Sequence, residues 1–172
     1  MTAPMTPKGV AELLVRYRLP KELLLPLAQV LVTGDREILM EPAAVLCAQN
    51  EPADALYLLL EGTLEVRRRD FRNESRVIAE ARSPAILGHM ALLLSKRRTA
   101  ALSAGRSGAR VLALPADAVH QLNESDTAAG NALRRLILAA LLDQHHRAVV
   151  DLLHTSGDTD LSLPAGWVQV EG

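Results

Sequence analysis

The sequence predicts a mainly β protein, an antiparallel jelly roll with helices at both ends. Between residues 37 and 114, apolar runs alternate with turn residues at a spacing of roughly ten, which is typical of antiparallel sandwiches and rolls. Before and after this region, apolar residues recur at helical spacing instead. A chain of 172 residues is long enough to bury one hydrophobic core and to carry a modest extension.

The N-terminal region predicts an arm followed by two helices. Residues 1–7 hold two prolines and two threonines, so we expect a loose arm there. Apolar side chains recur at helical spacing over residues 10–17. Pro20 ends this helix and opens a second one, which we expect over residues 21–31.

The jelly roll is expected to consist of short strands. Each strand is an apolar run bounded by Gly, Pro, Asn, Asp or Ser, the residue types that favour turns. The segment 88–100 interrupts the series as its one helix-like insertion. The runs cover residues 37–40, 44–47, 55–60, 63–67, 76–80, 100–104 and 109–114.

After residue 114 the chain becomes helical again. Pro115 opens a short helix, and a longer helix without internal proline follows over residues 127–154. The remaining tail is polar and contains Trp167, which we expect to pack against another surface that the sequence does not identify. The predicted organisation is an arm at 1–7, a domain at 8–154 with its roll at 37–114 and its C-terminal helices at 115–154, and a tail at 155–172.

Composition narrows the classes of function. The formal net charge is −1 and aromatic residues make up 2%, so we expect neither a nucleic-acid partner nor attraction to an acidic membrane. No window approaches the roughly 18 apolar residues of a membrane span, and the N-terminus lacks a signal-peptide pattern. The single cysteine, Cys47, lies in an apolar run, which indicates a core residue in a reducing compartment. We therefore expect a cytoplasmic protein.

Catalytic and metal-binding sequence patterns are missing. The sequence contains no nucleophile elbow, no Ser/His/Asp pattern and no Walker glycine loop, so we expect a regulator and not an enzyme. His145 and His146 have no further ligand at a recognised spacing, and no metal site is predicted. The run Arg67–Arg69 is interpreted as a solvated strand end, with a nucleic-acid patch as the alternative.

The segment Gly88-His-Met-Ala-Leu-Leu-Leu-Ser-Lys-Arg-Arg98-Thr-Ala100, called the cassette below, carries the strongest functional signal. Gly88 opens a short apolar helix, and an arginine and a threonine follow in the second half of the segment. Backbone N–H groups of the first helical turn and the guanidinium of Arg98 can bind the same small anion. The cassette therefore predicts a phosphate site.

Together, residues 50–66 and 88–100 resemble the strand–turn signature and the phosphate-binding cassette of the cyclic nucleotide-binding domain family. The resemblance extends over roughly residues 21 to 154. It implies a cyclic nucleotide of cAMP or cGMP type, whose phosphate would be bound by Arg98, the N–H groups near Ala91 and the Thr99 hydroxyl. The candidate ligand-binding residues are Gly88, His89, Met90, Ala91, Arg98, Thr99 and Ala100.

Three positions depart from the family pattern. The acidic residue that accepts a hydrogen bond from the ribose 2′-hydroxyl is His89 here. Losing a charged acceptor, worth about 1.5–3 kcal/mol, would weaken a nucleotide roughly 10- to 150-fold unless neutral imidazole accepts in its place. Two structural glycines are Ala43 and Asn50. Asparagine tolerates the left-handed region, whereas Ala43 indicates a turn that is built differently.

Two functions follow from these observations. The first is a non-enzymatic bacterial sensor domain that binds a cyclic nucleotide and signals through its C-terminal helix to another protein. The second is a degenerate domain that no longer binds nucleotide and serves as a scaffold for protein–protein interaction. Arg98 favours the first and His89 the second. The 18 residues after the long helix are too few for a helix-turn-helix module, so we expect either that the output is contact with another protein or that there is none.

The long helix carries two apolar stripes. One is suited to packing on the roll and contains Leu133, Leu136, Ile137, Ala140 and Leu141. The other follows the 4-3-4-3 spacing of a heptad, from which we expect a homodimer, and its histidine would make association sensitive to pH. This second stripe, called the dimer seam below, consists of Leu138, Leu142, His145, Val149 and Leu152.

Overall fold

The computed structural model describes residues 5–33, 36–94 and 96–156, with side-chain surroundings up to residue 150. The chain divides into two compact units, residues 1–140 and 141–172. The first unit contains the sheet and the helices around it, and the second begins within the last helix. The tail expected at 155–172, with Trp167, lies outside the described residues apart from its first two positions.

The N-terminal helices are α1 (Pro7–Leu14), a 3-10 turn (Val15–Tyr17) and α2 (Lys21–Thr33). Helix α1 begins at Pro7 because proline suits the first helical position and the Thr6 hydroxyl accepts a hydrogen bond from Gly9 N at 3.2 Å. Pro7, which the sequence pattern assigns to the arm, is thus the first residue of this helix.

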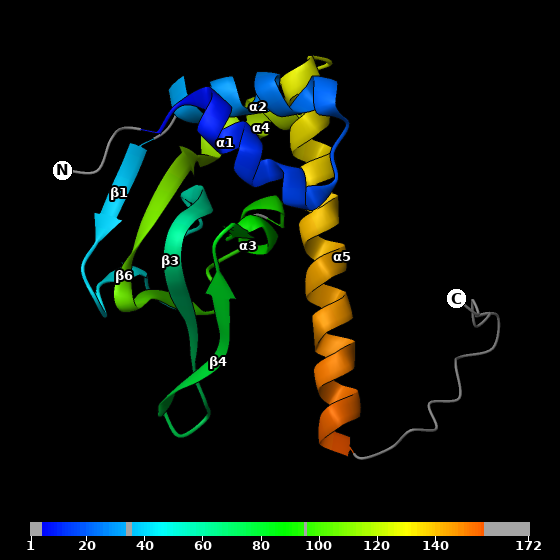
Figure 1. The fold of residues 1–172 in the computed structure, drawn as a ribbon. Coiled ribbons are helices and arrows are strands. Elements are labelled where there is room, and N and C mark those ends of the chain that lie inside the picture. The colour runs from blue at the N-terminus through cyan, green and yellow to red at the C-terminus, as the bar shows by residue number, and fades with distance from the viewer. Residues whose placement is uncertain (1–4, 34–35, 95, 157–172) are drawn as a thin grey trace. The chain divides into compact units, whose positions relative to one another are not determined.

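An antiparallel sheet of six strands forms the body of the first unit, as the sequence predicts. The strand order is β1-β6-β3-β4 (Figure 1). In addition, β2 pairs with β6 and β5 pairs with β3. The strands are β1 (Arg36–Met40), β2 (Val45–Cys47), β3 (Ala55–Arg69), β4 (Ser75–Arg82), β5 (Ala85–Leu87) and β6 (Ala101–Pro115).

Strands β3 and β6 each join two of the predicted runs into one long strand of 15 residues. The register between them shifts near Gly62, and the ladder continues on both sides of the shift. Gly62 has φ +80°, and a Cβ there would lie 2.3 Å from the carbonyl oxygen of Gly108. Glycine thus lets the two long strands bend together without separating. The short strand β5 is not among the predicted runs.

The core is mostly aliphatic, as the low aromatic content requires. Strand β3 is buried on both faces from Ala55 to Leu60. Alternate side chains of this segment enter the core between the sheet halves, and helix α4 packs against β3 and β6. In Figure 1, α1, α2 and α4 lie across one end of the sheet. The core between the sheet halves contains Met40, Cys47, Ala55, Tyr57, Leu59, Leu64, Leu87, Leu102, Ala104, Val111 and Ala113.

Three further helices are α3 (His89–Leu93), α4 (Ala116–Glu124) and α5 (Ala128–Ser156). Helix α5 agrees with the predicted range 127–154 to within two residues. Its first stripe is buried at Leu133, Leu136, Ile137 and Ala140, as expected for packing on the domain. Within the part of the chain that the structure describes, no helix is long and apolar enough to cross a membrane.

Candidate ligand-binding site

The cassette begins with a left-handed turn between β5 and α3. Gly88 has φ +82° and is the N-cap of α3. A Cβ at this position would lie 2.5 Å from Arg98 Nη1 and 3.3 Å from the carbonyl oxygen of Ala55. Glycine is therefore required twice, once for the backbone angle and once so that the guanidinium of Arg98 can lie against the turn.

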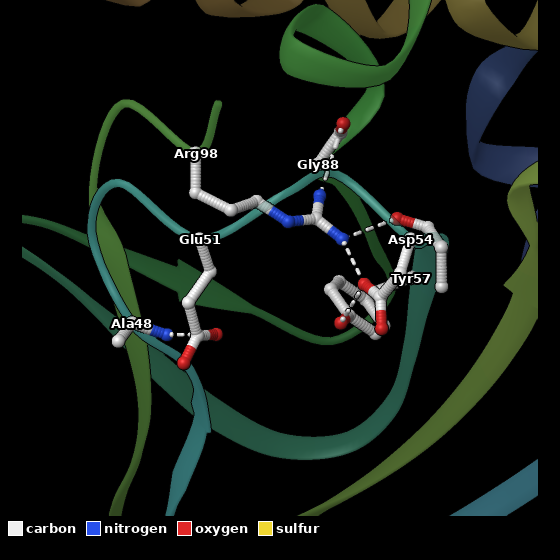
Figure 2. Close-up of polar contacts among 7 residues, drawn as sticks. Ala48, Glu51, Asp54, Tyr57, Gly88 and Arg98 are labelled. Atoms are coloured by element: carbon white, nitrogen blue, oxygen red, sulfur yellow. Dashed lines mark hydrogen bonds and ion pairs between the residues drawn. The ribbon is translucent and has the colours of Figure 1, made fainter. Parts of the chain in front are cut away.

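Arg98 is buried, with 3% of its surface exposed, and it points into the domain. Its Nη2 donates to Asp54 Oδ1 at 2.9 Å and to the carbonyl of Ala55 at 2.7 Å. Its Nη1 donates to the carbonyl of Gly88 at 3.3 Å, and its guanidinium carbon lies 4.9 Å from the centre of the Tyr57 ring. Figure 2 shows these contacts converging on the guanidinium.

The charge of Arg98 changes the acidity of its neighbours. Partial burial raises the pKa of the Asp54 carboxyl, but hydrogen bonding and attraction to Arg98 outweigh that effect, and the pKa lies below its ordinary value. Burial raises the pKa of Tyr57 to about 12, against the opposing charge of Arg98. The Asp54 side chain remains 76% exposed, so a largely solvated carboxylate partners a buried cation.

The loop of residues 48–54 holds the end of the cassette by its backbone. Asn50 N donates to the carbonyl of Arg98 and Arg98 N donates to the carbonyl of Glu51, both at 2.8 Å. The loop is itself closed by Glu51 Oε2, which accepts from Ala48 N at 2.8 Å (Figure 2). Asn50 has φ +70°, the left-handed angle that the sequence leads us to expect for a glycine replacement.

The expectation that Ala43 marks a differently built turn is wrong. Ala43 has φ +62°, the same left-handed region as Asn50. Its N–H donates to the carbonyl of Ala104 at 3.1 Å, while Ala104 N donates to the carbonyl of Ala44 at 2.8 Å. These two backbone hydrogen bonds to β6 hold the turn in a conformation that alanine rarely adopts on its own.

His89 is the first residue of α3 and is 5% exposed. Neither of its ring nitrogens has a hydrogen-bond partner among the described residues, and Arg98 Nε has none there either. In the part of the chain that the structure describes, these are the buried side-chain nitrogen and oxygen atoms left without one. Burial lowers the pKa of His89, which favours the neutral ring with one donor and one acceptor. The cassette thus contains buried hydrogen-bonding groups that the protein itself does not use.

The other predicted residues lie around this centre. Ala91 is buried in α3, whereas Met90 on the same helix is 42% exposed. Thr99 is exposed and Ala100 half-buried, directly after Arg98 in the chain. The structure therefore brings Gly88 and Arg98 into contact. The remaining predicted residues are the neighbours of these two along the chain.

Sequence reasoning missed Asp54 and Tyr57 as members of this site. Both belong to the segment 50–66, which supported the family resemblance only as a strand–turn pattern. The sequence does offer one signal that could have found Asp54: it directly precedes a strand that is apolar on both faces. A carboxylate at the end of such a strand is well placed to pair with a buried cation.

The dimer seam is exposed where the structure describes it. Leu138 is 58% exposed, Leu142 62% and Val149 37%, and His145 is also exposed. The surroundings of Leu152 lie outside the described side chains. Among the described residues, no group of three or more His, Cys, Asp or Glu is arranged to hold a metal ion.

A comparison with protein families gives one match. The model described as the cyclic nucleotide-binding domain matches residues 37–126, more than half of the 172-residue chain. The chain belongs to the cyclic nucleotide-binding domain family. The matched region contains the whole cassette together with Asp54 and Tyr57. No curated protein matches the chain.

Solved structures share the fold of this cyclic nucleotide-binding domain at low identity. A cyclic nucleotide-binding domain from Methylobacillus flagellatus is 19% identical with a TM-score of 0.74, covering 91% of this chain and 86% of that one. A putative cyclic nucleotide-binding protein from Geobacter metallireducens is 23% identical with a TM-score of 0.62, covering 81% and 97%.

The catabolite activator protein of Thermus thermophilus is 20% identical with a TM-score of 0.62, covering 80% of this chain. This chain spans 61% of the length of that protein. At these identities the likeness shows the fold, an antiparallel jelly roll with flanking helices.

Proposed function

We propose that this domain is a cytoplasmic, non-enzymatic regulator that binds a cyclic nucleotide of cAMP or cGMP type in the cassette and signals through its C-terminal helix to a protein partner. The observation that carries the proposal is the set of unpartnered buried atoms on His89 and Arg98. Buried polar groups without partners are costly, and native proteins keep few of them. Both residues belong to the segment that the family uses for the phosphate.

A comparison within the domain supports a ligand role for Arg98. Arg110 is also buried, at 5% exposure, and it pairs with two carboxylates: Nε with Glu37 at 2.5 Å and Nη1 with Glu61 at 3.1 Å. No nitrogen of Arg110 is among the unpartnered atoms. Arg98 has one carboxylate, mostly solvated, and leaves Nε without a partner. Arg98 therefore retains capacity for an anionic ligand.

The cassette offers the other groups that a cyclic phosphate requires. The N–H groups of the first turn of α3 have no carbonyl four residues earlier within the helix and are suited to an anion. The exposed hydroxyl of Thr99 follows Arg98 directly. In the proposed complex, neutral His89 accepts the hydrogen bond from the ribose 2′-hydroxyl that an acidic residue accepts elsewhere in the family.

Isothermal titration calorimetry with cAMP, cGMP, cCMP and cUMP tests the proposal. The wild-type domain should bind at least one of them, and Arg98→Gln should abolish that binding. Arg97→Gln is the matched control, because Arg97 is the exposed neighbour whose Nη1 donates to the carbonyl of Asn50. Thermal unfolding of each variant checks that it is folded. Absence of heat with all four nucleotides at high concentration would end the proposal.

A second function is favoured by the Arg98–Asp54 ion pair. A guanidinium already paired within the chain, next to a histidine in place of the acid, is what a degenerate domain used as a protein scaffold would show. Such a scaffold would bind its protein partner equally well with Arg98→Gln and with or without nucleotide. The sensor requires the partner's affinity to change when the nucleotide binds.

We further propose that the domain forms a homodimer through the dimer seam. Leucine at 138 and 142 and valine at 149 are exposed at heptad spacing, an arrangement that helix pairing would bury. Pairing of this helix would connect the cassette-bearing domain of one copy to that of the other, and would give the C-terminal helix a state that a partner can recognise.

A further inference from the structure

A groove of about 880 Å³ lies on the outer face of the sheet, opposite the core. Side chains alternate along a strand, so Leu64 and Leu102 face the core while their neighbours face outward. The outward residues Glu65 and Arg67 line the groove together with small residues of β6. None of the predicted ligand-binding residues lines it.

The charged residues of this outer groove are unequally partnered. Glu65 is paired with Arg67 at 2.7 Å, and Asp70 is paired with Arg76 at 3.3 Å and accepts from two backbone N–H groups of its own turn. In contrast, within the described ranges no carboxylate lies within 4.0 Å of the guanidinium of Arg69, whose Nη1 donates to Asn73 at 3.2 Å.

Arg106 is the second arginine of the groove that lacks a carboxylate. Its side chain is exposed and forms no ion pair with any described residue. Both acids of the groove are thus neutralised internally, while Arg69 and Arg106 keep their charges available. The groove therefore has a net attraction for negative charge.

These two arginines lie at opposite ends of the groove. Arg67 pairs with Ala101 and Leu64 with Ala104, so Arg69 lies beyond the first pair and Arg106 beyond the second. Along the ladder this separation corresponds to roughly 20 Å at about 3.3 Å per residue. An extended peptide of about six residues matches this backbone separation, whereas a mononucleotide is shorter than it.

The floor between the two ends consists of small residues, Ala101, Ser103 and Gly105. Such a floor leaves room for the backbone of an extended chain, and the arginines at the ends would bind its carboxylates. We infer that the outer groove binds an extended acidic peptide segment of a partner protein, with Arg69 and Arg106 as its two anchoring residues. The inference does not depend on the proposed nucleotide site, since neither anchoring residue belongs to the cassette.

Nucleic acid fits these features less well. Among the described residues, no aromatic side chain lines the groove to stack on bases. The run Arg67–Arg69, for which a nucleic-acid patch is the alternative interpretation, therefore contributes to a peptide site in this inference.

Fluorescence anisotropy with a labelled octaglutamate peptide tests the inference on the full chain. The wild-type protein should bind it at low salt, and binding should weaken from about 50 to about 300 mM salt as exposed charges become screened. Tetraglutamate, which spans about 14 Å when extended, should bind about tenfold more weakly because it is shorter than the backbone separation of the two anchoring arginines. Octalysine and a neutral Gly-Ser peptide should not bind.

The double variant Arg69→Glu/Arg106→Glu should weaken octaglutamate binding about tenfold or more. The matched control is Lys21→Glu/Arg36→Glu, which changes the net charge equally at exposed sites outside the groove and should leave binding unchanged. Thermal unfolding and circular dichroism confirm that both variants are folded.

Four results would overturn the inference: absence of octaglutamate binding, equal loss in both double variants, indifference to peptide length, or equal or tighter binding of an oligothymidylate. The last would assign the groove to nucleic acid. None of these results bears on calorimetric binding of cyclic nucleotides, so failure here and failure of the proposed function are distinguishable.

Discussion

The guanidinium of Arg98 lies 2.9 Å from the carboxylate of Asp54, although 44 positions separate the two residues in the chain. This ion pair joins the end of the cassette to the start of β3, the strand that pairs with β4, β5 and β6. A ligand that contacts Arg98 would therefore be linked, through the Arg98–Asp54 ion pair, to the strand at the centre of the sheet.

Asp54→Ala should destabilise the domain through Arg98. The change leaves a buried guanidinium without its carboxylate, and because Asp54 is mostly exposed we expect a loss of about 1–2 kcal/mol in the free energy of unfolding. Urea unfolding measures this loss. Glu80→Ala is the matched control, because Glu80 pairs with Arg82 at the surface. Equal effects of the two substitutions would contradict a structural role for the Arg98–Asp54 pair.

Gly88→Ala should disrupt the cassette more than an ordinary glycine substitution. Position 88 has φ +82°, and the added Cβ would meet Arg98 Nη1 at 2.5 Å. We expect a loss of about 1–3 kcal/mol in the free energy of unfolding. Gly9→Ala is the control. Gly9 lies in helix α1, and the added Cβ would be 3.5 Å from its nearest neighbour, the Thr6 hydroxyl, so stability should stay the same or rise slightly. If Gly88→Ala left the free energy of unfolding unchanged, the guanidinium of Arg98 would not need to lie this close to the turn.

His89 should make stability depend on pH. Burial lowers its pKa below the ordinary value of 6.5, so below that pH the unfolded chain takes up a proton that the folded chain does not. The unfolded state then binds more protons, and stability falls as the pH decreases. Above pH 6.5 the His89 ring is neutral in both the folded and the unfolded state, and its full contribution to the free energy of unfolding is present. For this one group the slope cannot exceed about 1.4 kcal/mol per pH unit, the value for a difference of one bound proton.

Urea unfolding between neutral pH and about pH 5 checks the slope, with His89→Gln as the test variant. Removing the buried imidazole should flatten the curve in this interval. His120→Gln makes the same change at an exposed histidine of α4 and should leave the curve as it is in the wild type. An unchanged slope in His89→Gln would mean that other groups cause the dependence.

The dimer seam gives a prediction about oligomeric state. Leu142→Glu places a charge in the predicted helix pair, so light scattering after size exclusion should find a dimer for the wild type and a monomer for the variant. Gln144→Glu, an exposed change on the same helix, should remain dimeric. A monomeric wild type at high concentration would contradict the proposed homodimer.

The sequence predicts much of this fold because the signals are local. Alternation and turn residues place β1, β2 and β4, and helical spacing places α2 and α5. The union of runs into β3 and β6 is not predictable locally. Gly62 and Gly108 have the residue type of turns, whereas the ladder that continues past them depends on pairing between distant segments.

The part of the candidate site that the sequence predicts is also the part whose signal is local. Gly88 and Arg98 occur within one short segment, so their spacing is visible in the sequence. Asp54 is brought to Arg98 by tertiary structure alone. The burial of His89 also depends on packing, since nothing in its immediate sequence distinguishes a buried ring from a ligand-facing one.

Ligand-linked unfolding of the wild type and Arg98→Gln tests the central claim most directly. The nucleotide that gives heat in calorimetry is added at about one hundred times its dissociation constant, where it should stabilise the wild type by about 2.7 kcal/mol. The account predicts this increment for the wild type and for Arg97→Gln, and none for Arg98→Gln. Equal stabilisation of all three proteins would contradict it, because the nucleotide would then bind without the buried guanidinium of the cassette.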